Sequence, residues 1–115
     1  MVIIRFPSGA EWFKANWAFR AIVEEITSRE RHDEELRTIL ELGGAYGLLE
    51  INALESGVAQ RTVQALRLAS RALLENIPGA SRQASDQTGF LDALVELIEL
   101  CDMHRPVQNE DSQVP

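Results

Sequence analysis

The sequence has a single cysteine, Cys101, among its 115 residues, and it lacks a long uninterrupted apolar run. One cysteine cannot form a disulfide within the chain, which is typical of proteins from a reducing compartment. A transmembrane helix needs roughly 20 apolar residues in a row. The N-terminus also lacks the basic segment and apolar stretch of a signal peptide. We therefore expect a cytoplasmic protein without a membrane partner.

The sequence also lacks the residue patterns of an enzyme or a metalloprotein. Cys101 and His104 have a spacing that helix-borne metal ligands can show, but a closed zinc site needs about four ligands and only His32 and scattered acids could complete one. The glycine-rich stretch 43–47 has neither the preceding strand nor the lysine of a phosphate-binding loop. The sequence also shows no nucleophile–base pair of the kind used in covalent catalysis. We expect no enzyme activity, no metal and no cofactor.

The composition is that of one globular domain. Hydrophobic residues make up 45% and charged residues 25% of the chain, which is enough apolar material for one core and too few charges for global disorder. We expect a single domain over residues 1–104 and a disordered polar tail over 105–115. The net charge of −7 counts against a nucleic-acid partner. The segment 58–85 is an exception, because it has four arginines and one acid.

Apolar periodicity predicts an all-α fold of about five helices, with starts near Ala10, Glu34, Leu48, Ala59 and Gly89. The first helix follows from the capping-box spacing of Ser8 and Glu11 and an apolar stripe at about 100° per residue. The preceding segment 2–6 is β-prone. It is expected to be a short extended arm, or a strand paired within the chain or with another subunit.

The remaining boundaries follow from caps and breakers. Asp33 can cap the second helix, and the glycines at 43, 44 and 47 should end or bend it. Thr88 can cap the last helix, so the small and polar stretch 80–89 is interpreted as a loop. The fourth helix should end at Asn76, since Ile77, Pro78 and Gly79 follow.

The stretch 52–66 has a recognisable arrangement around Gly57. Ala53 lies four residues before this glycine, and Val58, Val63 and Leu66 follow it at spacings that would pack a second helix on a first. The pattern resembles the helix-turn-helix of bacterial transcriptional regulators, with a winged-helix-like support helix over 33–42. The resemblance implies a sharp turn at Gly57 with a positive φ, within a motif spanning about 48–76.

The resemblance also implies a DNA-binding site. In such motifs the start of the second helix meets base edges in the major groove, and basic residues further along contact phosphates. The leading hypothesis is therefore a homodimeric transcriptional regulator that binds double-stranded DNA. The residues expected to contact DNA are Gln60, Arg61, Thr62, Gln64, Arg67 and Arg71.

Two alternatives stay open at this point. The same residues also fit two packed helices with a glycine turn and no DNA-reading role. The protein would then be an acidic all-α interaction module of the adaptor, antitoxin or immunity type, with a protein partner. For the homodimer, the first and last helices have more apolar surface than one face can bury. The interface residues expected are Phe13, Trp17, Phe90, Leu94 and Leu97.

Overall fold

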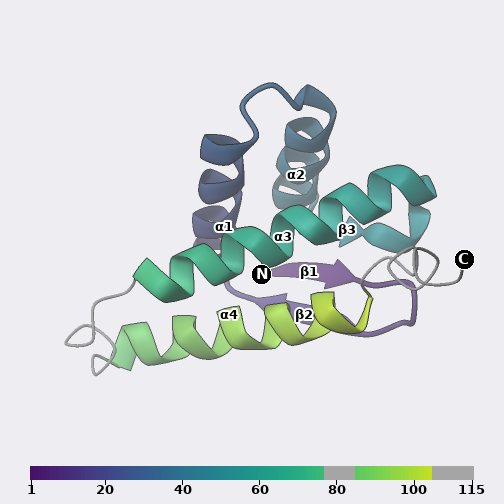
Figure 1. The fold of residues 1–115 in the computed structure, drawn as a ribbon. Coiled ribbons are helices and arrows are strands. Elements are labelled where there is room, and N and C mark those ends of the chain that lie inside the picture. The colour runs from purple at the N-terminus through teal and green to yellow at the C-terminus, as the bar shows by residue number, and fades with distance from the viewer. Residues whose placement is uncertain (77–84, 105–115) are drawn as a thin grey trace, which may run out of the picture.

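The computed structural model of the chain describes residues 1–76 and 85–104. Within these ranges the prediction of an all-α fold with five helices is wrong, because a three-stranded mixed sheet accompanies four α-helices (Figure 1). The elements in chain order are β1 (Val2–Arg5), β2 (Glu11–Lys14), α1 (Asn16–Arg29), α2 (Glu34–Tyr46), β3 (Leu48–Glu50), the 3-10 helix η1 (Ile51–Ala53), α3 (Ser56–Asn76) and α4 (Ser85–Met103).

The β-prone segment at the N-terminus is the central strand of the sheet. β1 pairs with β2 in antiparallel and with β3 in parallel orientation. Ile4 lies between Trp12 and Leu49 in this register, and all three side chains are buried on one face of the sheet. The N-terminal segment therefore pairs with strands of the same chain and is not a free arm.

The helix predicted to begin near Ala10 begins only at Asn16, because the preceding residues form a β-hairpin. Gly9 has a φ of 95° in the turn, and the Phe6 amide donates to the Ala10 carbonyl across it at 2.8 Å. The Ser8 hydroxyl accepts a hydrogen bond from the Ala10 amide, so it supports the turn and caps no helix. Trp12 is then buried and Phe13 exposed, which is the alternation of a strand.

The second helix begins where the sequence predicts. The Asp33 carboxylate caps α2 by accepting a hydrogen bond from the Leu36 amide at 3.0 Å. The helix continues through Gly43 and ends at Gly47, which adopts a left-handed conformation with φ 75°. Gly43 has a packing role, because a Cβ there would lie 3.1 Å from the Leu49 Cβ. The glycine lets α2 approach β3 closely.

The third predicted helix, from Leu48, is absent from the fold, since β3 and the short η1 occupy its place. α3 begins at Ser56, three residues before the predicted start, and reaches Asn76 as predicted. α4 begins at Ser85, so residues 85–89 are helical and the prediction of a loop there is wrong. The remaining part of that loop, 80–84, and the predicted tail, 105–115, lie outside the described residues.

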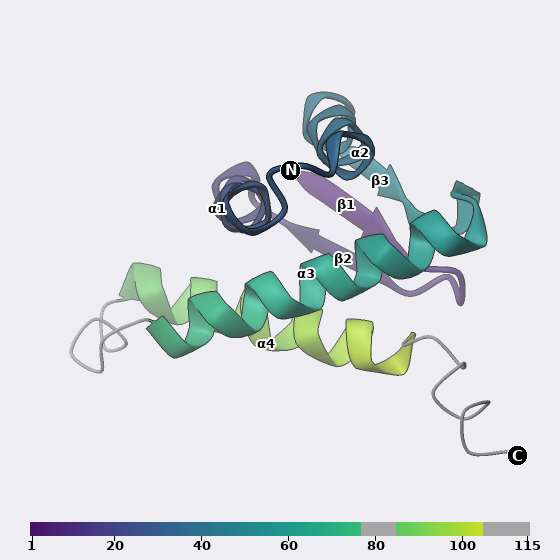
Figure 2. The same ribbon diagram turned by 45° about the horizontal axis from the view of Figure 1, so that its top comes forward.

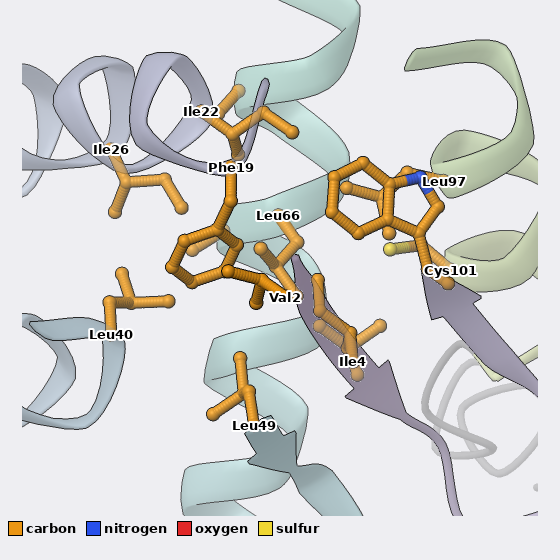
Figure 3. Close-up of a cluster of buried hydrophobic side chains, with 14 of the residues drawn as sticks. Val2, Ile4, Phe19, Ile22, Ile26, Leu40, Leu49, Leu66, Leu97 and Cys101 are labelled. Atoms are coloured by element: carbon orange, nitrogen blue, oxygen red, sulfur yellow. The ribbon is translucent and has the colours of Figure 1, made fainter. Parts of the chain in front are cut away.

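The core lies between the inner face of the sheet and the helices. Figure 2 shows α1 and α2 standing beside each other at one end, with α3 and α4 running alongside one another across the molecule. Phe19, Leu40 and Val2 point toward one another where α1, α2 and β1 meet, and Leu66 of α3 lies beside them (Figure 3). The Trp12 indole N–H donates to the Ala93 carbonyl at 2.9 Å, which ties β2 to α4.

Candidate functional site

The segment that resembles a helix-turn-helix does not adopt that geometry. Its first part is the strand β3 and the three-residue helix η1, so it has no α-helix before the turn. Gly57 lies inside the first turn of α3, and among the described residues only Gly9 and Gly47 have a positive φ. The chain passes from η1 to α3 through Leu54, which has an extended backbone, and Glu55. The predicted role of Gly57 is therefore wrong.

The six residues predicted to contact DNA do not form one free surface. Gln60, Gln64 and Arg71 are exposed along one stripe of α3. Thr62 is fully buried, and its hydroxyl donates to the Val58 carbonyl at 2.8 Å. A buried hydroxyl cannot meet a base edge.

Arg61 is exposed, but the carboxylates at the start of α2 neutralise it. Its Nη2 donates to Glu35 Oε1 at 2.8 Å, and its Nε lies 3.5 Å from Asp33 Oδ2. The hydrogen bond to Glu35 and then the charge of Asp33 raise the pKa of the Arg61 guanidinium, and Glu55 adds to this effect. Arg61 is therefore the cation at the centre of an acidic cluster.

Arg67 has a structural role. Its side chain is only 14% exposed, and its Nε donates to Asp102 Oδ1 at 2.6 Å. This pair links the middle of α3 to the end of α4. Arg67 therefore ties α3 to α4, and most of its side chain is covered.

A groove lies between the start of α2 and the start of α3. It has a volume of about 560 Å³. Three glutamates that are exposed to solvent, Glu34, Glu35 and Glu55, line it together with apolar side chains. The other lining residues are Thr38, Ile39, Ala53, Leu54 and Val58.

Two of the three acids in this groove also have a local role at the start of α2. Glu34 and Glu35 do lie in the first turn of α2, where carboxylates favour the helix dipole. Glu55, however, is separated from them by twenty residues, and the fold brings it to the same groove. The acidic composition was the only sequence signal for this surface, since local spacing cannot show which helix starts meet.

The residues predicted for a dimer interface are divided between core and surface. Leu94 and Leu97 are fully buried, and Phe90 is nearly so. Phe13 and Trp17 are 53% and 52% exposed. Trp17 also packs against Phe90, with ring centroids 5.3 Å apart. Only Phe13 and Trp17 could contact a second copy without rearrangement of the core.

Cys101 and His104 have structural contacts. Burial raises the pKa of the Cys101 thiol to about 12, with a smaller contribution from Asp102, so the thiol stays protonated near neutral pH. The His104 ring stacks on Phe6 at 4.8 Å, and its nitrogens lie 2.7 Å from the Leu100 carbonyl and the Ser8 hydroxyl. The described residues contain no group of three His, Cys, Asp or Glu side chains that could hold a metal ion.

None of the helices in residues 1–76 and 85–104 combines the length and apolar character needed to cross a membrane. Comparison of the chain with protein-family models, with curated proteins and with solved structures found no match.

Proposed function

We propose that this chain is an acidic protein-interaction module that binds a basic, partly apolar segment of another protein in the groove between α2 and α3. The observation that carries the proposal is the make-up of that groove. Glu34, Glu35 and Glu55 surround apolar side chains of η1, α2 and α3, and the one arginine of the cluster already has carboxylate partners. Lysine or arginine beside leucine-like side chains would complement both properties.

The geometry gives DNA binding less support. A DNA-reading surface needs free cations, because phosphate contacts supply most of the affinity. Among the predicted contacts, Arg61 and Arg67 are paired with acids. The glutamates around Arg61 would repel a phosphate backbone, and the net charge of −7 would add to this. Of the three arginines expected to contact DNA, Arg71 alone has no acidic partner within residues 1–76 and 85–104.

The two parts of the groove would contribute differently to binding. An exposed ion pair contributes only about 0–1 kcal/mol, whereas buried apolar surface contributes about 25 cal/mol per Å². The apolar floor would therefore supply most of the affinity. The carboxylates would select a basic segment and speed its association, and salt would weaken this effect.

Charge reversal on the rim of the groove tests the proposal. The probe is a fluorescent synthetic helical peptide with leucines on one face and lysines beside them, followed by anisotropy. The double variant Glu34→Lys/Glu55→Lys should weaken peptide binding by about tenfold or more, since two attractive contacts become repulsive. Leu54→Ser, which makes the apolar lining of the groove more polar, should also weaken peptide binding. This loss should persist at high salt.

The matched control reverses two exposed acids outside the groove, in Glu24→Lys/Glu99→Lys. This variant changes the net charge by the same amount, so a long-range charge effect would act equally on both double variants. We expect the control to bind the peptide within about threefold of the original protein. Equal weakening by both double variants, or no peptide binding by the original protein, would overturn the groove as the binding site.

Self-association is a second and separate proposal. Phe13 and Trp17 are large aromatic side chains with about half of their surface exposed, and such residues are enriched at protein interfaces. They lie on β2 and at the start of α1, and neither lines the acidic groove. We expect a dimer in sedimentation experiments at tens of micromolar, and Phe13→Ser/Trp17→Ser should convert it to a monomer. A monomeric original protein would exclude this proposal.

A further inference from the structure

A second hollow lies between α2 and α1. It has a volume of about 230 Å³. For comparison, an engineered apolar cavity of about 150 Å³ binds benzene. Its lining is mainly apolar, with Phe19 and Leu40 at the buried end where α1 and α2 meet (Figure 3). The other apolar lining residues are Val2, Val23, Gly44 and Ala45.

The charged groups of this pocket are one cation and one anion on opposite walls. Arg20 is on α1 and Glu41 is on α2, and both side chains are exposed at the mouth. Neither forms an ion pair with any residue in the described part of the chain. Asn16 adds an amide on the α1 side. Arginine suits a carboxylate, which it can bind with two parallel hydrogen bonds, and a glutamate suits an ammonium group.

We propose that this pocket binds a small zwitterion with an apolar side chain, namely a free α-amino acid of the leucine or phenylalanine type. The apolar side chain lies against Val23 of α1 and Ala45 of α2, which are accessible in the pocket. The carboxylate contacts Arg20, and the ammonium group contacts Glu41. The pocket has the usual composition of a small-molecule site, which is an apolar lining with a few polar groups that fix orientation.

Other ligand classes fit this pocket less well. A phosphate or another multivalent anion would place its charge against Glu41 with only Arg20 to balance it. A metal cation would find a single carboxylate, and the described residues contain no metal-binding cluster. A fully apolar ligand would gain nothing from the Arg20 and Glu41 side chains at the mouth. The basic peptide proposed for the α2–α3 groove has no carboxylate for Arg20, so the two sites differ in ligand chemistry.

Three related probes separate the contributions of the two charges. They are L-phenylalanine, 3-phenylpropionate, which lacks the ammonium group, and phenethylamine, which lacks the carboxylate. Binding is followed by chemical-shift changes of the full chain in NMR titrations. Arg20→Gln should weaken the binding of L-phenylalanine and 3-phenylpropionate by about tenfold and leave that of phenethylamine unchanged, since only the first two have a carboxylate for the guanidinium. Glu41→Gln should weaken the binding of phenethylamine and leave that of 3-phenylpropionate unchanged.

Two further variants complete the design. Gly44→Val places a side chain in the pocket, where even a Cβ would lie 3.4 Å from Phe19, and it should abolish binding of all three probes while circular dichroism shows an intact fold. Glu24→Gln, one turn beyond Arg20 on α1 and outside the pocket lining, should change nothing. The inference is overturned if L-phenylalanine causes no shifts at about 10 mM, a concentration that detects even millimolar binding. It is also overturned if Arg20→Gln and Glu41→Gln weaken all three probes equally.

Discussion

The two faces of the three-stranded sheet differ in the burial of their side chains. The inner face presents Val2, Ile4, Trp12 and Leu49, and all four are buried. The outer face has half-buried and exposed side chains, among which Arg5 bridges Glu11 and Glu50 at 2.9 and 2.7 Å. The apolar residues of the outer face are Ile3, Phe13 and Leu48. The comparison indicates that the inner face supplies stability, whereas the outer face is free for contacts with other molecules.

Adjacent residues of β2 give the largest expected contrast between these faces. Trp12→Ala should lower the free energy of unfolding by about 3–5 kcal/mol, because it leaves a cavity and removes the hydrogen bond to Ala93. Phe13→Ala should lower it by less than about 1 kcal/mol, since that ring is half-exposed. Urea titrations of the two variants measure both values. Equal losses would contradict the division into a stabilising and a free face.

The core behind the inner face gives a pH-dependent prediction. Burial raises the pKa of the Cys101 thiol from 9.0 to about 12. The unfolded chain therefore loses the thiol proton first as the pH rises. The contribution of the protonated thiol to stability is complete below about pH 9 and is lost as the pH approaches 12. Alkaline pH should thus destabilise the fold through this group.

The variant Cys101→Ala isolates that contribution. Its stability should fall less than that of the original protein between about pH 8 and about pH 10.5, because one shifted group has been removed from the balance. All other ionisable groups remain as a common background. Parallel urea titrations at the two pH values provide the measurement. Identical pH dependence in both proteins would show that the thiol is accessible to solvent in the folded state.

The smallest effect is expected for the ion pairs of the outer face. Arg5→Met should shift the urea midpoint much less than Trp12→Ala, because exposed ion pairs are weak and salt screens the attraction between their charges. The shift should shrink further when salt is added. Glu11→Gln/Glu50→Gln removes the same pairs from the acidic side and is the matched variant. A shift as large as that of Trp12→Ala would assign the outer face a major part in stability.

The parts of the fold that local sequence signals can determine were predicted correctly. The Asp33 cap and the apolar spacing of the following residues define the start of α2, and Asn76 is the end of α3. The hairpin was missed because the segment Ser8–Lys14 satisfies a helix-start pattern, and only pairing with β1 selects the strand. β3 has three residues, which is too short for a period of two to be recognised.

The candidate sites depend even more on tertiary structure. Arg61 is exposed, but its neutralisation depends on Asp33 and Glu35, which lie at the start of another helix. The pairing of Arg67 with Asp102 joins residues 35 positions apart. Charge counts along the sequence showed an arginine-rich segment, whereas in the fold Arg61 is paired with Glu35 and lies close to Asp33. A local count of charges cannot establish which partners the fold will supply.

The most direct test of the central claim compares binding of the two classes of partner. The original protein is titrated at low salt against a labelled duplex DNA of mixed sequence and, separately, against the lysine–leucine peptide. The account predicts that the peptide binds at micromolar protein and the duplex does not, because carboxylates line the groove beside Arg61. Retention of the duplex, with loss of that binding in Arg61→Ala or Gln64→Ala and no binding of the peptide, would contradict the account and support a DNA-binding regulator.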